Sequence, residues 1–186
     1  MKRTLFILTL TAIFSLGVIS CGKKDAAPAP EAAKTDDAMA KRKEGYNAVI
    51  AMFNSGNMAD LGKHIDSNFV DHNPDPMQKP GIAGLVESMT MFRAGFPDFK
   101  MEVTNLVAEG DMLAGQIRIT GTCANDMMGP GMKGKKIDVK GMDLIKFNKD
   151  GKAVERWGYW EEKKMMQQLG MLPSDEEMMK DHAPKK

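Results

Sequence analysis

The chain has 186 residues, which is enough for one domain of ordinary size and too short for two complete domains. Its 26 lysine and arginine residues are balanced by 25 aspartate and glutamate residues, and the resulting charge of +1 argues against a nucleic-acid-binding protein. With 2 cysteines the chain is no disulfide scaffold, whereas its 18 methionines make it unusually rich in flexible thioethers.

The N-terminal 20 residues have the layout of a secretory signal peptide. Two basic residues are followed by an apolar run over 5–19, which is too short to span a bilayer comfortably. We therefore expect residues 1–20 to be a lipoprotein signal peptide that is removed. The alternative is an uncleaved anchor helix.

The segment 18–21 (VISC) resembles the lipobox of bacterial lipoproteins, with an aliphatic residue, small residues and then cysteine. The resemblance implies that Cys21 becomes the first mature residue and carries a lipid, which anchors the protein in the bacterial cell envelope. Gly22 follows in place of an aspartate, so the inner-membrane retention signal of some Gram-negative bacteria is absent. We therefore expect the outer membrane, or a periplasmic or exterior face, rather than the inner membrane.

Composition divides the remaining chain into three parts. Residues 21–40 are rich in alanine, proline, lysine and aspartate and have one methionine as their only large apolar side chain, which predicts a flexible tether. Residues 41–172 contain the periodic apolar segments of a folded domain, and 173–186 form a tail. Cys123 is the only thiol left in the mature chain, so no intramolecular disulfide is expected.

Apolar residues recur with the spacing of an amphipathic helix in two segments of the domain. They are Tyr46, Val49, Ile50 and Phe53 in the first segment, and Ile82, Leu85, Val86, Met89 and Phe92 in the second. We expect a helix around each set, the second ending before Pro97. A short helix at 58–64 and a brief extended segment at 68–74 are expected between them.

The second half of the domain changes to the two-residue period of β-strands. Strands are predicted near 101–107, 113–119, 137–147 and 153–160. The turn residues at 148–151 predict a hairpin between the last two strands. A helix over 161–169 follows, and Gly170 is expected to end it.

Three N-terminal helices followed by a meander of long strands indicate an α+β fold, with one curved antiparallel sheet packed on its helices. A strongly bent sheet that folds around helices leaves a cone-shaped space. The open end of that cone is where we expect the mouth of a pocket.

Asp143 is the strongest single candidate for a functional residue. Counting in twos places it on the same face of its strand as Val139, Ile145 and Phe147. A carboxylate on an apolar face costs free energy unless it is paired or serves a function. The alternatives are a solvated carboxylate near the sheet edge, or a bulge that turns the side chain outwards.

His72 and several aromatic residues are further candidates. His72 shares a face with Val70, and a histidine suits proton transfer or hydrogen bonding to a ligand, although a lone histidine often serves only a local partner. Trp157 and Tyr159 share one face of the last strand, with Trp160 on the other. Aromatic residues commonly line small-molecule pockets, and core filling is the alternative. The expected pocket-lining residues are Trp157, Tyr159, Phe53, Phe92 and Met128.

Residues 124–134 form a loop rich in glycine, proline and methionine between two strands. Flexible thioethers can make an adaptable apolar lid. Met127, Met128 and Met132 could also bind copper(I), although apart from Cys123 no soft ligand lies beside them. Zinc-ligand spacing, a phosphate-binding glycine loop and a Cys-x-x-Cys pair are all missing from the sequence, so we expect no metal site and no cofactor.

Several short segments occur in the order that is typical of one known family. They are 69–74 (FVDHNP), 96–98 (FPD), 109–111 (EGD), 121–122 (GT), 141–143 (GMD), 150–157 (DGKAVERW) and 168–170 (QLG). Together they resemble the SnoaL-like polyketide cyclase (ester cyclase) family, a branch of the nuclear-transport-factor-2-like superfold. The resemblance extends over about 46–172.

The resemblance implies a cone-shaped α+β barrel with one deep apolar pocket, which often dimerises through the outer face of its sheet. Characterised cyclases of the family close a polyketide ring by intramolecular aldol condensation without a cofactor. They use an aspartate as acid and base, helped by a polar residue on the preceding strand. Matched without gaps, the acid/base position falls on Gly158, the helper position on Asp143, and a frequent histidine on Cys123.

Two functions are open at this point. In the first, an envelope lipoprotein holds an apolar or carbonyl compound and carries out cofactor-independent acid/base chemistry with Asp143 and His72 as catalytic residues. In the second, it binds an apolar ligand or acts as a scaffold without catalysis, because Gly158 has no carboxylate. The expected partners are a small apolar molecule, membrane lipid and a second copy of the chain through the sheet, and no nucleic acid.

Overall fold

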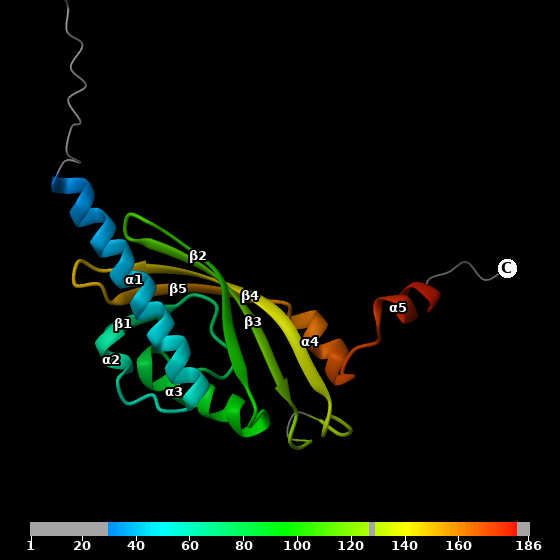
Figure 1. The fold of residues 1–186 in the computed structure, drawn as a ribbon. Helices are drawn as coiled ribbons and strands as arrows, with labels where there is room; N and C mark the ends of the chain where they lie inside the picture. Colours follow the sequence, from blue (N-terminus) through cyan, green and yellow to red (C-terminus); the bar gives the residue numbers. More distant parts are fainter. Residues whose placement is uncertain (1–29, 127–128, 182–186) are drawn as a thin grey trace, which may run out of the picture.

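The computed structural model describes residues 30–126 and 129–181, which form helices and strands around one sheet (Figure 1). In chain order the elements are α1 (Pro30–Ser55), α2 (Leu61–His64), β1 (Ile65–Asp71), α3 (Gly81–Gly95), β2 (Lys100–Glu109), β3 (Met112–Thr122), β4 (Lys136–Phe147), β5 (Ala153–Trp160), α4 (Glu162–Leu169) and α5 (Asp175–Asp181). The signal segment, Cys21 and Met128 lie outside the described residues. No helix in the described part of the chain is long and apolar enough to cross a membrane.

The sheet has the strand order β1-β5-β4-β3-β2, so that β1 and β2 form its two edges. Strands β2 to β5 pair antiparallel with one another, whereas β1 runs parallel to β5. The α+β fold with a curved sheet packed on N-terminal helices is confirmed (Figure 1). The expectation of a wholly antiparallel sheet is wrong at β1, because the long connection through α3 and three strands lets the chain return in the same direction.

Alternate residues of β3 and β4 turn towards the helices and form the core. The buried residues of these two strands are Leu113, Ile117, Ile119, Ile137, Val139, Ile145 and Phe147. Helix α1 contributes Tyr46, Ile50 and Phe53 to the same core. The two-residue period of the strands and the helical spacing in α1 therefore meet in one apolar layer, as the sequence predicts.

Helix α1 begins at Pro30, so part of the predicted tether is helical. The segment 30–40 (PEAAKTDDAMA) contains four alanines and several charged residues, and alanine is the strongest helix former. Proline is well tolerated at the first position of a helix, because a backbone N–H at that position would make no hydrogen bond within the helix. The structure therefore lengthens the predicted helix by more than three turns on its N-terminal side.

Strand β5 contains a one-residue bulge at its start. Phe147 pairs with Ala153, but the next residue back, Lys146, pairs with Glu155, so Val154 has no partner of its own on β4. An extra residue of this kind turns every later side chain of the strand to the opposite face. The bulge at Val154 therefore determines which alternate side chains of β5 face the core.

Two side-chain amides dock helices against free strand edges. Asn54, at the end of α1, donates from Nδ2 to the carbonyl of Met101 at 2.8 Å and accepts from the Met101 N–H at 2.6 Å. Gln168 of α4 makes the same kind of pair with the backbone of Asp138, at 3.1 and 2.9 Å. Gly170 ends α4 with a positive φ of 72°, as predicted.

Candidate functional site

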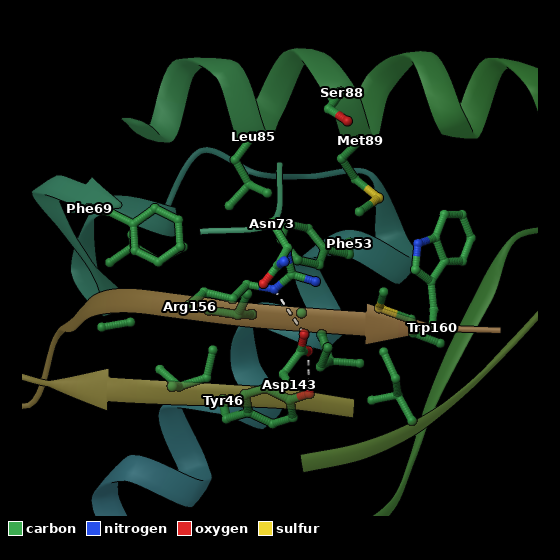
Figure 2. Close-up of a pocket in the computed structure, with 18 of the residues that line it drawn as sticks. Tyr46, Phe53, Phe69, Asn73, Leu85, Ser88, Met89, Asp143, Arg156 and Trp160 are labelled. Atoms are coloured by element: carbon green, nitrogen blue, oxygen red, sulfur yellow. Dashed lines mark hydrogen bonds and ion pairs between the residues drawn. The ribbon is translucent and has the colours of Figure 1, made fainter. Parts of the chain in front are cut away.

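A cavity of about 150 Å³ lies between the inner face of the sheet and the helices α1 and α3. Figure 2 shows α3 on one side of the lining side chains and strands β4 and β5 on the other. Much of its wall is aromatic or aliphatic, with Phe53, Phe69, Phe92 and Trp160 among the larger contributors. A cavity of this size can hold a molecule about as large as one aromatic ring.

Asp143 lies in the wall of this cavity and is only 5% exposed, which confirms its predicted position on the inner face of β4. Tyr46 of α1 donates from its hydroxyl to Oδ2 of Asp143 at 2.8 Å, and Arg156 of β5 donates from Nε to Oδ1 at 2.8 Å. In Figure 2 the two dashed lines from Tyr46 and Arg156 meet at the Asp143 carboxylate. The carboxylate that an apolar face would penalise is therefore fully paired.

Arg156 joins Asp143 to a second buried carboxylate. Its Nη1 nitrogen donates to Oδ2 of Asp71 at 2.8 Å, and Gln78 donates to the same oxygen at 3.3 Å. Asp71 and Arg156 are direct neighbours in the parallel β1–β5 pair. Burial alone lowers the pKa of Arg156, but the charges of Asp143 and Asp71 more than offset burial and hold the pKa above its usual value.

The Tyr46 phenol is held in its neutral form. Burial raises its pKa well above the usual value, and the neighbouring negative charge of Asp143 raises it further. The ring lies directly against Gly115 of β3, where a Cβ would approach the ring to 2.8 Å. The absence of a side chain at Gly115 therefore gives the Tyr46 ring the space it needs to reach Asp143.

Gly158 is the cross-strand partner of Asp143 and also lines the cavity. A Cβ atom built on Gly158 would overlap the guanidinium of Arg156. The place that a side chain at position 158 would take is therefore filled by the cation of Arg156. This is the position on which the family resemblance places a catalytic aspartate.

His72 is not among the residues that line the cavity, so the structure does not bring it together with Asp143 as the sequence prediction expects. Its ring stacks on Trp157 with centroids 4.4 Å apart and an angle of 6° between the planes. Its Nε2 is 2.9 Å from Oε2 of Glu155, and the side chain is 36% exposed. Val70, on the same face, is exposed as well, so the face that the sequence pattern assigns to the pocket is the outer one.

The predicted aromatic lining is partly correct. Phe53 and Phe92 line the cavity as predicted. Trp157 does not, because it stacks on His72 at the outer face, and Trp160 lines the cavity instead. Tyr159 borders the cavity but is 63% exposed. The bulge at the start of β5 explains the exchange, since without it Trp157 would pair with Asp143 and face inwards.

The described part of the methionine-rich loop shows packing rather than ligation. Met132 is 2% exposed and belongs to the core, and Cys123 is buried with its Sγ donating to the carbonyl of Asn125 at 3.1 Å. Within the residues that the structure describes, no group of three or more histidine, cysteine or carboxylate side chains is placed to hold a metal ion.

Several site residues are missing from the sequence prediction. They are Tyr46, Asp71, Gln78, Arg156 and Trp160. The helical spacing assigns Tyr46 only to the core. One available signal is Gly158, because a glycine inside a strand often marks the close approach of other atoms, here a guanidinium.

Comparisons with solved structures show the same fold in other proteins. A protein assigned as a polyketide cyclase from Bacillus cereus ATCC 10987 is 26% identical, with a TM-score of 0.62 over 71% of this chain and 82% of that one. AclR, assigned as a hydroxylase, from Streptomyces galilaeus is 26% identical, with a TM-score of 0.65 over 78% of this chain and 90% of that one. IdmH from Streptomyces antibioticus, assigned as a polyketide cyclase, is 26% identical, with a TM-score of 0.61 over 69% and 98%.

Of the two sequence comparisons, one finds a match. A search of curated proteins finds no match to the chain. The sequence model described as SnoaL-like polyketide cyclase, however, matches residues 43–169, which is well over half of the chain and includes the whole cavity wall from α1 to β5. The chain therefore belongs to the SnoaL-like polyketide cyclase family.

Proposed function

We propose that the protein binds a small, mostly apolar molecule in the cavity, with the polar group of that molecule against Arg156. One observation carries the proposal: a largely apolar wall contains a buried ionic cluster made of Tyr46, Asp143, Arg156 and Asp71. Small-molecule pockets have this composition, in which apolar walls supply affinity and a few fixed polar groups set the orientation.

The cluster is arranged to hold a polar atom rather than to move a proton. Both carboxylate oxygens of Asp143 already accept hydrogen bonds, one from Tyr46 and one from Arg156. The raised pKa of Tyr46 keeps its proton in place, and Gly158 supplies no carboxylate. Binding without catalysis is therefore the function that this geometry supports best.

Fluorine NMR of protein labelled with fluorotryptophan tests this proposal directly. The 2 tryptophans lie on opposite sides of β5, with Trp160 in the cavity and Trp157 on the outer face. Titration with acetophenone, a one-ring ketone, should shift the Trp160 signal until it saturates and leave the Trp157 signal in place. A Trp160 signal that never moves, or equal shifts of both signals, would contradict binding in this cavity.

A matched pair of variants localises the binding. Ile117→Phe adds volume inside the cavity, where Ile117 is part of the wall, and should weaken acetophenone binding at least about tenfold. Val107→Phe makes the same kind of change at a strand residue that is 66% exposed and should leave the affinity unchanged. Equal affinities in the two variants would place the ligand elsewhere.

Acid/base chemistry is the second candidate function, and the buried position of Asp143 beside the Tyr46 hydroxyl favours it. Such chemistry would exchange the methyl protons of acetophenone for deuterium in heavy water, through the enol. Binding alone predicts the same exchange rate with the protein, with the Asp143→Asn variant and in buffer. A rate that rises with wild-type protein and falls back with Asp143→Asn would establish the catalytic function instead.

We also propose that a lipid on Cys21 holds this domain at the bacterial cell envelope, with the outer membrane favoured. The support is the signal layout and the lipobox-like segment 18–21, both of which lie outside the described residues. Expression in a bacterium supplied with labelled palmitate should label the wild-type protein and leave the Cys21→Ser variant unlabelled. Equal labelling of both proteins would contradict the anchor.

A further inference from the structure

We infer that the cavity selects a neutral hydrogen-bond acceptor, such as a ketone, over a carboxylate, and that Gly158 is the positioning residue behind this choice. The inference rests on the proposed function, because it names the charge class of the molecule that the cavity binds. It follows from how Arg156 shares its hydrogen bonds.

Arg156 keeps one terminal nitrogen for a ligand. Its Nε donates to Asp143 and its Nη1 to Asp71, whereas Nη2 donates to no group among the residues that the structure describes. Nη2 is also the atom nearest to the Cβ position of Gly158, which is part of the cavity wall. A ligand that enters the cavity therefore meets a positively charged N–H donor, which disfavours a cationic ligand.

The charge of Arg156 is already offset before any ligand arrives. Two carboxylates, Asp143 and Asp71, each lie 2.8 Å from a nitrogen of the one guanidinium. A ligand carboxylate would be a third negative charge around a single positive charge, inside a cavity where water screens little. A neutral carbonyl oxygen accepts the Nη2 hydrogen bond without adding a charge, so it fits the site best.

Gly158 makes this arrangement possible. Every other residue type carries a Cβ, and a Cβ here would overlap the guanidinium and push it away from its present place. Because Gly158 lies opposite Asp143 on the neighbouring strand, its missing side chain seats the guanidinium beside that carboxylate. Strand geometry rather than a flexible loop therefore fixes the donor.

Acetophenone and benzoate provide the test, because they share one ring and differ mainly in the charge of the polar group. At neutral pH the Trp160 fluorine signal should report acetophenone binding at least about tenfold tighter than benzoate binding. Asp71→Asn removes one negative charge beside Arg156 and should narrow this ratio several-fold. Asp150→Asn, an exposed change of equal charge at the hairpin tip, should leave the ratio unchanged.

Each result bears on a different statement. Benzoate that binds as tightly as acetophenone or tighter overturns the inference and leaves the proposed function standing. Binding of neither compound overturns the proposed function and the inference together. A ratio that Asp71→Asn and Asp150→Asn change equally overturns the role of the buried carboxylates, and the wild-type comparison still decides the preference if Asp71→Asn does not fold.

Discussion

A single missing side chain decides where the cation of the site lies. Gly158 has no Cβ, and the Arg156 guanidinium occupies the space that a Cβ would fill. From there it donates hydrogen bonds to both Asp143 and Asp71. We expect Gly158→Ala to destabilise the protein by about 1–3 kcal/mol, because the extra methyl group forces the guanidinium away from its carboxylates. Urea unfolding measures the change.

The matched control for that substitution is Gly62→Ala in the short helix α2. A Cβ at Gly62 meets no atom within 4 Å, so the change should alter stability by no more than about 1 kcal/mol and in the stabilising direction. If Gly158→Ala is as well tolerated as Gly62→Ala, the guanidinium does not need the space above position 158.

Tyr46 gives the site a pH dependence in the alkaline range. Its folded-state pKa is raised above the usual value of 10.0, first by burial and then by Asp143, so the stability it contributes is present below pH 10 and lost as the pH rises further. The chain has 2 tyrosines, so Tyr46 is the only tyrosine in the Tyr159→Phe variant. Tyrosinate absorbance should then appear only when the protein unfolds, and a smooth rise in folded protein would contradict the buried Tyr46–Asp143 bond.

At the scale of elements, the strands show what a sequence pattern can and cannot predict. Counting in twos places Asp143 correctly, because β4 is regular from its start to its end. In β5 the count correctly puts Trp157 and Trp160 on opposite faces, but it assigns the wrong face to the cavity, because the bulge at Val154 turns Trp160 inwards and Trp157 outwards. No turn or glycine marks that bulge in the sequence, and it exists only as a register between two strands.

Strand β1 shows a related limit. Val70 is apolar, so the pattern assigns its face, and His72 with it, to the interior, although Val70 is 47% exposed and Asp71 is the residue that points inwards. The buried Asp71 depends on a charge partner, Arg156, that lies 85 residues further along the chain. Local sequence carries no trace of such a pairing, which arises only from the parallel β1–β5 contact.

The junction between α1 and the edge strand β2 can be tested on its own. Asn54→Ala removes the amide that satisfies both the N–H and the carbonyl of Met101, and should cost about 1–3 kcal/mol of stability. Asn68→Ala, at an exposed position of β1, should change stability by less than about 0.5 kcal/mol. Equal losses in thermal or urea unfolding would contradict the docking role of Asn54.

At the scale of the whole molecule, the outer face of the sheet carries an apolar surface. Its exposed members include Val70, Met142, Leu144 and Tyr159, with Trp157 as the direct cross-strand neighbour of Leu144. Exposed apolar surface of this kind often marks an interface. We propose that two copies of the chain associate through this face, which would leave both cavities open to ligand.

Sedimentation measures this association. Wild-type protein should sediment as a dimer, and Leu144→Lys should shift it to monomer, because the substitution places a charge in the centre of the proposed interface. Met91→Lys, at a similarly exposed apolar residue of α3, should leave the dimer intact. A monomeric wild-type protein would contradict the proposal.

The central claim is that the cavity holds an apolar molecule by its polar oxygen at Arg156. A crystal structure of the protein with acetophenone tests this claim most directly. We expect the ring among Phe92, Phe53 and Trp160, and the carbonyl oxygen within hydrogen-bond distance of Nη2 of Arg156. A ligand bound outside the cavity, or one inside it whose oxygen points away from Arg156, would contradict the account.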